Sequence, residues 1–213
     1  MKSKNIGFGE YLCYAMRQIG GSCKMENIYL KLAENRTLET ERLLLRPVTL
    51  DDAEDMFEYS SDEENTRYTF LPNKDLEETK NIIARLFIGR PLGNWGIELK
   101  ESGKLIGSID LHKLDPVLKK AAIGYVVHKN YWNQGLATEA LKEIIHLAFE
   151  RLDMNMLVAL HDVENPASGR VMEKVGMNFS HIDPYAALNL HKEGRISQRA
   201  YYRLTKEDYF EKH

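Results

Sequence analysis

A tight turn between a strand-like run and a long amphipathic run is the strongest constraint in this sequence. Residues 121–128 are almost continuously apolar, which predicts a buried strand, and from residue 136 to 152 apolar positions recur at helical spacing. Gly135 and Ala137 leave the backbone uncovered where this helix begins. Exposed N–H groups of a first helical turn bind phosphate-like anions, so the turn is a candidate anion site.

The turn at 131–140 lacks the glycine patterns of two common phosphate-binding loops. It contains neither Gly-x-x-x-x-Gly-Lys-Ser/Thr nor Gly-x-Gly-x-x-Gly, which disfavours a nucleoside triphosphate and a Rossmann dinucleotide site. Two alternatives stay open on these residues alone: a pyrophosphate held by main-chain N–H groups, and a tight turn that binds nothing.

The other elements are predicted from the same two periodicities. Strands are expected at 39–47, 95–100, 105–112, 121–128, 156–160, 177–182 and 199–204, helices at 49–59, 76–88, 136–152 and 166–176, and loops at 60–74 and 183–197. The order predicts an α/β fold with a mixed, mostly antiparallel central sheet flanked by helices, as a single domain over residues 38–213. Residues 1–37 lack a sustained period and are predicted to be an N-terminal extension, with short helices near 11–19 and 27–33.

Composition excludes several partners. The 213 residues carry a net charge of −3, and the 29 Lys and Arg form no block, so no nucleic-acid footprint is predicted. No apolar stretch approaches the ~20 residues that cross a bilayer, and the first residues do not form a signal peptide. We therefore expect a cytoplasmic protein without a membrane partner. Cys13 and Cys23 have no His or Cys at zinc spacing, which predicts neither a metal site nor a disulfide framework.

Taken together, the motifs resemble the GNAT family of acetyl-CoA-dependent N-acetyltransferases. They are Ile-Gly-Tyr-Val-Val at 123–127, Gln-Gly-Leu-Ala-Thr-Glu-Ala at 134–140, Asn-Pro-Ala-Ser at 165–168 and Glu-Lys-Val-Gly-Met at 173–177. The run Thr-Glu-Arg-Leu-Leu-Leu-Arg-Pro at 40–47 is similar to the subgroup of ribosomal-protein N-terminal acetyltransferases. The resemblance covers roughly residues 38–209. It implies a GNAT-like fold and direct transfer of acetyl from acetyl-CoA to a primary amine, on a protein N-terminus or a small molecule.

The resemblance also implies a set of residues that bind the cosubstrate. In the family, backbone amides of the turn bind the CoA pyrophosphate, and the strand before the turn separates from its neighbour so that its main chain can pair with the pantetheine arm. An Asn on the later helix positions that arm. The implied residues are Val126, Val127, His128, Gln134, Gly135, Leu136, Ala137, Thr138, Asn165 and Ser168.

Two proton tasks need further side chains, because the amine must attack as a neutral group and the thiolate must be stabilised as it leaves. Many members use a tyrosine for the thiolate, but the aligned residue here is Met172. Ser168 is the substitute that the resemblance implies. From the residues alone, Ser168 and Asn165 are equally well explained as the first turn and cap of a helix.

The general base is chosen from five side chains or from water, the five being Glu98, Asp110, His112, His128 and Asp162. Asp110 and His112 are predicted to act together, because residues two apart share one face of a strand. The missing tyrosine leaves an alternative function, an acyl-CoA-binding or regulatory module without catalysis. Segments 62–75 and 183–197 are predicted to border the amine cleft. The partly exposed strands of the family also make a homodimer an expectation.

Overall fold

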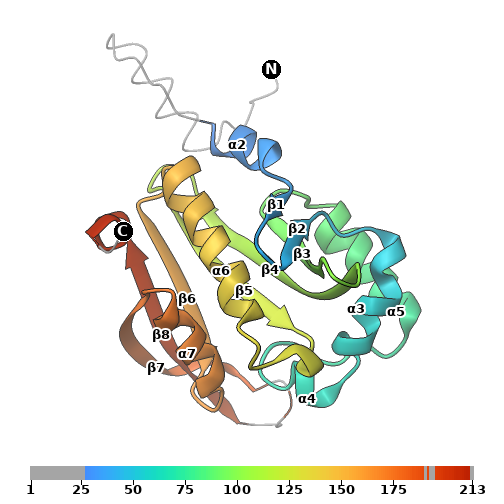
Figure 1. Ribbon diagram of the computed structural model, residues 1–213. Helices are drawn as coiled ribbons and strands as arrows, with labels where there is room; N and C mark the ends of the chain where they lie inside the picture. The colour runs from blue at the N-terminus through green and yellow to red at the C-terminus, as the bar shows by residue number, and fades with distance from the viewer. Residues whose placement is uncertain (1–26, 190, 192–194, 212–213) are drawn as a thin grey trace, which may run out of the picture.

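One mixed sheet organises the protein. The computed structural model describes residues 27–189, 191 and 195–211, and within them the strands form a single eight-stranded sheet in the order β1-β2-β3-β4-β5-β6-β8-β7 (Figure 1). Only the central pair β5 and β6 is parallel among the described strands. The bounds are β1 Leu38–Glu39, β2 Leu43–Arg46, β3 Asn94–Leu99, β4 Lys104–Asp115, β5 Lys120–Val127, β6 Met156–Asp162, β7 Asn178–Leu188 and β8 Ile196–Thr205. The predicted mixed, mostly antiparallel α/β fold is confirmed.

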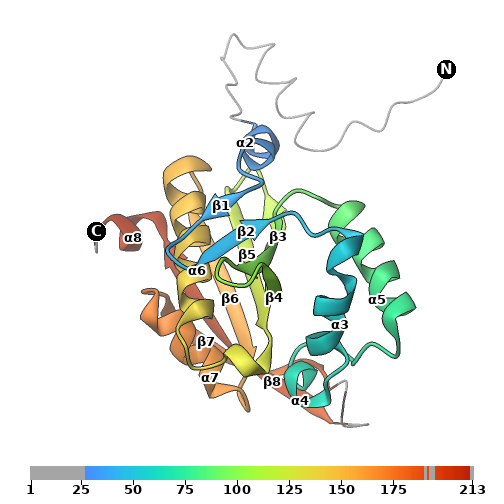
Figure 2. The ribbon, with the colours of Figure 1, turned by 45° about the vertical axis from the view of Figure 1, so that its right-hand side comes forward.

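Helices cover both faces of this sheet. Figure 2 shows α3 and α5 on one side and α6 and α7 on the other. The helices are α2 Ile28–Glu34, α3 Ala53–Ser60, α4 Glu63–Thr66, α5 Leu76–Ile82, α6 Leu136–His146, α7 Pro166–Lys174 and α8 Lys206–Glu211. A π-helical segment continues α5 through Ile88 and another continues α6 through Arg151, so the two long predicted helices are each observed as a pair of joined segments.

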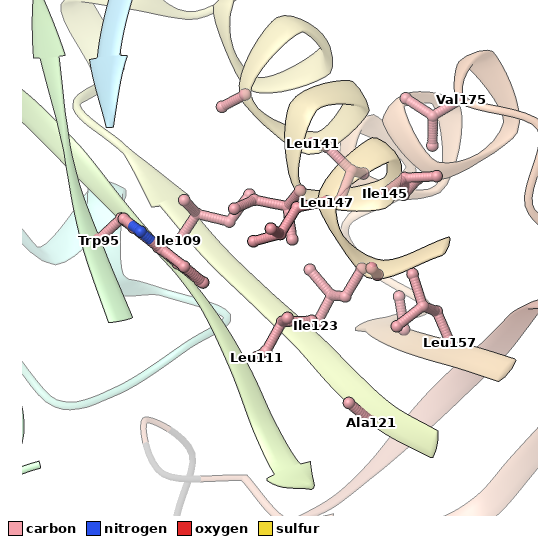
Figure 3. Close-up of a cluster of buried hydrophobic side chains, with 14 of the residues drawn as sticks. Trp95, Ile109, Leu111, Ala121, Ile123, Leu141, Ile145, Leu147, Leu157 and Val175 are labelled. Carbon is pink, nitrogen blue, oxygen red and sulfur yellow. The ribbon is translucent and has the colours of Figure 1, made fainter. Parts of the chain in front are cut away.

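The larger core lies between the sheet and α6. Leu141 and Ile145 of α6 point toward Ile109 and Ile123 on the central strands (Figure 3), and all four side chains are at most 3% exposed. Burying each such side chain stabilises the fold by about 1.5–3 kcal/mol. A smaller core on the opposite face joins α3 to Leu105. Both clusters fix β4 and β5, the strands on which the candidate site lies.

The prediction of a loop at 183–197 is wrong for most of that segment. Strand β7 continues through Leu188, and β8 already begins at Ile196, with Leu188 paired to Ile196. The register shifts between Asp183 and Ala187, which accommodates Pro184 on the edge strand of the sheet, where a missing N–H costs no ladder bond. Periodicity missed this hairpin because its side chains do not alternate between apolar and polar.

The predicted loop at 60–74 contains the four-residue helix α4. Its cap is Asp62, whose carboxylate accepts a hydrogen bond from the Asn65 amide at 2.9 Å. A single helical turn is too short to show a 3.6-residue period, so the sequence pattern indicated only a polar connection.

The helix predicted near 27–33 is observed as α2. Asn27 caps it, and Ile28 and Leu32 are 2% exposed in the main core. The helix predicted near 11–19 and the two cysteines lie outside the described residues. Of the helices in the described ranges, none has the length and apolar character needed to cross a membrane.

Asp153 should contribute pH-dependent stability. Its carboxylate accepts hydrogen bonds from the ammonium groups of Lys119 and Lys206, and these bonds, opposed by partial burial, lower its pKa from 3.8 to about 2. A lowered folded-state pKa means that the stabilisation is complete above about pH 4 and is lost as the pH falls toward 2. We expect Asp153→Asn to reduce the free energy of unfolding at pH 7 by about 1 kcal/mol, since the site is partly exposed.

Urea unfolding of wild type and Asp153→Asn at pH 7 and at pH 2.5 measures this effect. Asn is a suitable replacement, because the residue has a φ of 55° and Asn tolerates the left-handed region. The difference between the two proteins should be largest at pH 7 and much smaller at pH 2.5, where most of the stabilisation is lost. An equal difference at both pH values would show that the loss has another cause.

Candidate active site

Strands β5 and β6 separate from each other in the middle of the sheet. Their parallel pairing runs from Lys120 and Met156 to Ile123 and Ala159 and then ends, although β5 continues to Val127 and β6 to Asp162. The outer neighbours β4 and β8 stay paired with these strands along the unpaired stretch. The facing edges of residues 124–127 and 160–162 therefore border an opening in the sheet, which is the separation that the resemblance implied.

The glycine turn joins the end of β5 to the start of α6. Asn133 and Gly135 have φ values of 60° and 80°, so the chain reverses through two left-handed residues. Gly135 is the N-cap of α6, and no side chain caps the helix there. First-turn amides have no intrahelical acceptor, and residues 132–135 are exposed. The turn therefore has the geometry of an anion site, and it contains the implied residues Gln134, Gly135 and Ala137. Leu136 is buried beneath the turn, and Thr138 is half-buried.

Arg42 supplies a positive charge beside this turn, which the sequence patterns did not predict. Its Nη1 donates to the carbonyl of Gln134 at 3.0 Å, and its Nε donates to the Glu139 carboxylate at 2.7 Å. The other Glu139 oxygen accepts from the Thr40 hydroxyl at 2.6 Å and from the Arg42 amide at 2.8 Å. Burial raises the pKa of Glu139, but these hydrogen bonds outweigh it and lower the pKa overall. The carboxylate therefore stays charged and holds Arg42 next to Gly135.

Asp110 and His112 come together where β5 and β6 diverge. His112 Nδ1 lies 2.6 Å from Asp110 Oδ1. A Cβ atom placed on Gly124 would lie 3.1 Å from that oxygen and 3.4 Å from His112 Cε1, so the pair lies directly over the first residue of β5 beyond the paired segment. Both side chains are about 40% exposed and open to solvent. The predicted pairing of Asp110 with His112 is thus observed in the structure.

The remaining candidate bases have other partners or positions. Glu98 forms an ion pair with Arg46. The buried His128 accepts a hydrogen bond at Nδ1 from the Asn130 amide at 3.1 Å, which fixes the ring beside the turn. Asp162 is buried at the end of β6, on the far side of the opening from β5. Only Asp110 and His112 combine a paired acid and imidazole with a position over Gly124.

A hydroxyl pair lies on the opposite face of the opening. The Tyr125 hydroxyl is 2.8 Å from Ser168 Oγ and 3.1 Å from the Ser168 carbonyl. Asn165 caps α7 and accepts from the Ser168 amide at 3.4 Å, as expected for a cap. Burial raises the pKa of Tyr125 to about 12, although the hydrogen bond with Ser168 opposes the shift. Met172 is 1% exposed in the core and carries no group for proton transfer.

The last two predicted residues, Val126 and Val127, end strand β5. Val126 packs against the smaller core, and Val127 is buried on the side of α6. The carbonyl of Val127 accepts a hydrogen bond from Trp132 Nε1 at 2.7 Å, so the turn folds back onto the strand edge. The sequence patterns gave no signal for this contact.

The two segments predicted to border the amine cleft meet at the end of the opening. His191 Nε2 lies 3.1 Å from the carbonyl of Phe70. A small pocket beside this contact is lined by residues of both segments and of the neighbouring strands, namely Arg67, Tyr68, Thr69, Asp162, Leu188, Asn189, His191, Ser197 and Arg199. Segments 62–75 and 183–197 are therefore neighbours in space next to Asp162.

Known proteins share both the sequence pattern and the fold. Residues 42–178 match the family model described as an acetyltransferase (GNAT) domain. The chain is 35% identical to the N-acetyltransferase YoaA of Bacillus subtilis over 143 residues, covering 65% of this chain and 81% of that protein. It is 26% identical to the ribosomal-protein-serine acetyltransferase of Escherichia coli over 146 residues, which are 68% of this chain and 75% of that protein.

A solved structure agrees with this result. The GNAT-family acetyltransferase of Bacillus anthracis superposes with a TM-score of 0.72 at 27% identity, covering 80% of this chain and 99% of that one. The family match spans more than half of the sequence and includes the opening, the glycine turn and the cap of α7. This chain therefore belongs to the GNAT family of acetyltransferases and is an acyltransferase.

Proposed function

We propose that this enzyme transfers the acetyl group of acetyl-CoA directly to the primary amine of a protein N-terminus or of a small molecule. One observation carries the proposal. The unpaired end of β5 at 124–127 leads through a short turn to the start of α6 at Gly135, where no side chain caps the helix. An extended thioester can lie along the strand edge while its pyrophosphate rests on the helix N-terminus.

The chain's own groups fit acetyl-CoA at both ends. Amides of the turn from Gln134 to Thr138 and the nearby Arg42 would hold the pyrophosphate, since both supply donors and positive potential. The unpaired edge at Val126 and Val127 would pair with the pantetheine amides, and Asn165 and Ser168 at the start of α7 would contact the same arm. With these assignments, the Asp110–His112 pair and the Tyr125–Ser168 hydroxyl pair lie on opposite sides of the reacting thioester.

The proposed chemistry needs no covalent enzyme intermediate. Asp110 and His112 would accept a proton from the incoming ammonium, directly or through water, and the neutral amine would then attack the thioester carbonyl. Main-chain donors at the edge of β5 would stabilise the oxyanion. Ser168 would donate a hydrogen bond to the departing sulfur. Each of these groups lies on a strand or on the first turn of α7, which fixes its position.

The acceptor is proposed to enter from the pocket beside Asp162. Arg67 and Tyr68 on one side and Arg199 on the other would contact it. A relative in E. coli bears the name ribosomal-protein-serine acetyltransferase, and this supports a protein N-terminus as one acceptor class. The small size of the pocket between two chain segments is equally suited to a compact amine.

Release of free CoA in the presence of different amines tests the proposal. We expect turnover with at least one of four classes: peptides with a free N-terminus, lysine peptides, polyamines and aminoglycosides. Acetyl-CoA without amine is the control, and mass spectrometry of the acceptor shows a gain of one acetyl group. Tight acetyl-CoA binding without turnover on any class would instead favour a CoA-binding regulatory module.

A further inference from the structure

We propose that Tyr125 is a second hydroxyl of the active site, which polarises Ser168 so that the pair together stabilises the departing thiolate. The proposal rests on the proposed acetyl transfer and gives a role in it to the tyrosine of the 123–127 motif, to which no role has been assigned above. It follows from the position of the phenol, from its hydrogen bonds and from the acidity of the groups involved.

Tyr125 lies at the point where β5 has lost its parallel partner. The last paired residue is Ile123, and side chains alternate between faces along a strand. Gly124 therefore lies beneath Asp110 and His112 on one face, whereas Tyr125 points to the other face and packs against the main core. The base and the hydroxyl pair thus approach the opening from opposite sides, as an attacking amine and a leaving sulfur require.

The phenol of Tyr125 has two acceptors on Ser168, the Oγ atom at 2.8 Å and the carbonyl oxygen at 3.1 Å. The hydrogen bond between the two hydroxyls can run in either direction, and the proposal uses the one in which the phenol donates to the nearer Oγ. The Ser168 amide donates to Asn165, which fixes the first turn of α7. When the Tyr125 phenol donates to Ser168 Oγ across 2.8 Å, the Ser168 proton is free to point at a third group. Hydrogen bonds in such a chain polarise one another, so Ser168 becomes a better donor than an isolated serine.

The acidities of the groups decide between hydrogen bonding and full proton transfer. The phenol has a pKa of about 12, whereas an ordinary thiol has a pKa of about 8.5. Moving the phenol proton to a thiolate is therefore unfavourable, and the pair acts by hydrogen bonding. In the balanced step the C–N bond forms, the C–S bond breaks with its electron pair on sulfur, and the amine proton leaves through the base on the opposite face. The thiolate takes its proton from solvent.

Three variants test the pair by steady-state kinetics with the acceptor found active. Tyr125→Phe keeps the packed ring and should lower kcat about 10-fold, and Ser168→Ala should lower it roughly 10- to 100-fold. The double variant should be no slower than Ser168→Ala, because residues that act as a unit are not additive. The KM for acetyl-CoA should change less than about threefold, since the lost bond forms only as charge develops on sulfur.

Tyr202→Phe is the matched control. The Tyr202 hydroxyl also donates to α7, at the Glu173 carboxylate 3.1 Å away, so its loss tests simple anchoring of the helix. It should leave kcat unchanged. A ring-fluorinated tyrosine at position 125 provides a second readout, because its phenol ionises at lower pH and then cannot donate. The alkaline decline of kcat should move to lower pH in this protein, which a purely structural role would not cause.

The outcomes separate this proposal from the proposed function. An active wild type together with a fully active Tyr125→Phe overturns the role of Tyr125 and leaves acetyl transfer intact. Multiplicative effects in the double variant, or a loss confined to KM and thermal stability, also overturn it. A wild type that binds acetyl-CoA and acetylates no amine overturns both.

Discussion

Gly135→Glu is expected to weaken acetyl-CoA binding at least 100-fold while the protein remains folded. Gly135 is the N-cap of α6 and no side chain caps the helix there. A Cβ atom at this position would lie 3.5 Å from Arg42 Nη2, so any side chain would project beside Arg42. A carboxylate would occupy the anion site and compete for this guanidinium. Loss of two hydrogen bonds to a charged pyrophosphate, at about 1.5–3 kcal/mol each, predicts the size of the effect.

The hairpin glycine Gly103 offers a matched control. It has a φ of 69°, and a Cβ atom there would meet nothing within 4 Å. Gly103→Glu therefore introduces the same charge and a similar left-handed strain of about 1–2 kcal/mol, but in the turn between β3 and β4. Both variants should lose similar stability in urea unfolding, and only Gly135→Glu should lose binding in isothermal titration calorimetry.

Retained affinity in Gly135→Glu would remove the turn from the cosubstrate site. Equal losses in the two variants would point to general destabilisation instead of a local effect. Because acetyl-CoA stabilises the state to which it binds, the shift of thermal unfolding with added acetyl-CoA gives an independent reading. The shift should persist in Gly103→Glu and disappear in Gly135→Glu.

Sequence patterns predicted the parts of this protein that depend on local periodicity. The alternation along β4 placed Asp110 and His112 on one face, and the structure brings them within 2.6 Å. The 3.6-residue period identified α6, and Asn165 with Pro166 marked the start of α7 as observed. Each of these features depends on residues that are close in sequence.

Contacts between distant segments could not be predicted in this way. Arg42 and Glu139 are 97 positions apart, and Tyr125 and Ser168 are 43 apart. These separations are far longer than the repeat of a helix or a strand, so no local pattern connects the two members of either pair. The resemblance indicated the turn and Ser168, but only the contacts of Arg42 with the start of α6 and of Tyr125 with α7 show which charge and which phenol accompany them.

In the proposed mechanism, the two proton tasks fall on opposite faces of one strand. Gly124 leaves room for the carboxylate and imidazole above the opening, and the next residue, Tyr125, projects below it to Ser168. A larger residue at position 124 would displace the Asp110 side chain, because a Cβ atom would already lie 3.1 Å from its Oδ1. The space that Asp110 and His112 need above the strand therefore explains why a glycine stands in the 123–127 motif.

Asp110→Asn is accordingly expected to lower kcat by about 100- to 1000-fold, in the range found for loss of a general base. The amide keeps the size of the side chain and removes its charge, so His112 loses the carboxylate that orients it. His112→Gln should show a loss of similar size, and the double variant should be no worse than either, because the two groups act on one proton. Acetyl-CoA affinity should stay within about threefold of wild type, since neither group is assigned to binding CoA.

Asp115→Asn controls for an altered charge on the same strand. Asp115 Oδ1 accepts from the amides of Val117 and Leu118 at 3.0 and 2.9 Å, and an amide oxygen can still accept both bonds. This variant should retain its kcat. If Asp110→Asn also retained its kcat, the next candidate would be Asp162 at the end of β6, and Asp162→Asn would test it. A large loss in Asp110→Asn alone places the proton acceptor over Gly124, on the face of β5 opposite Tyr125.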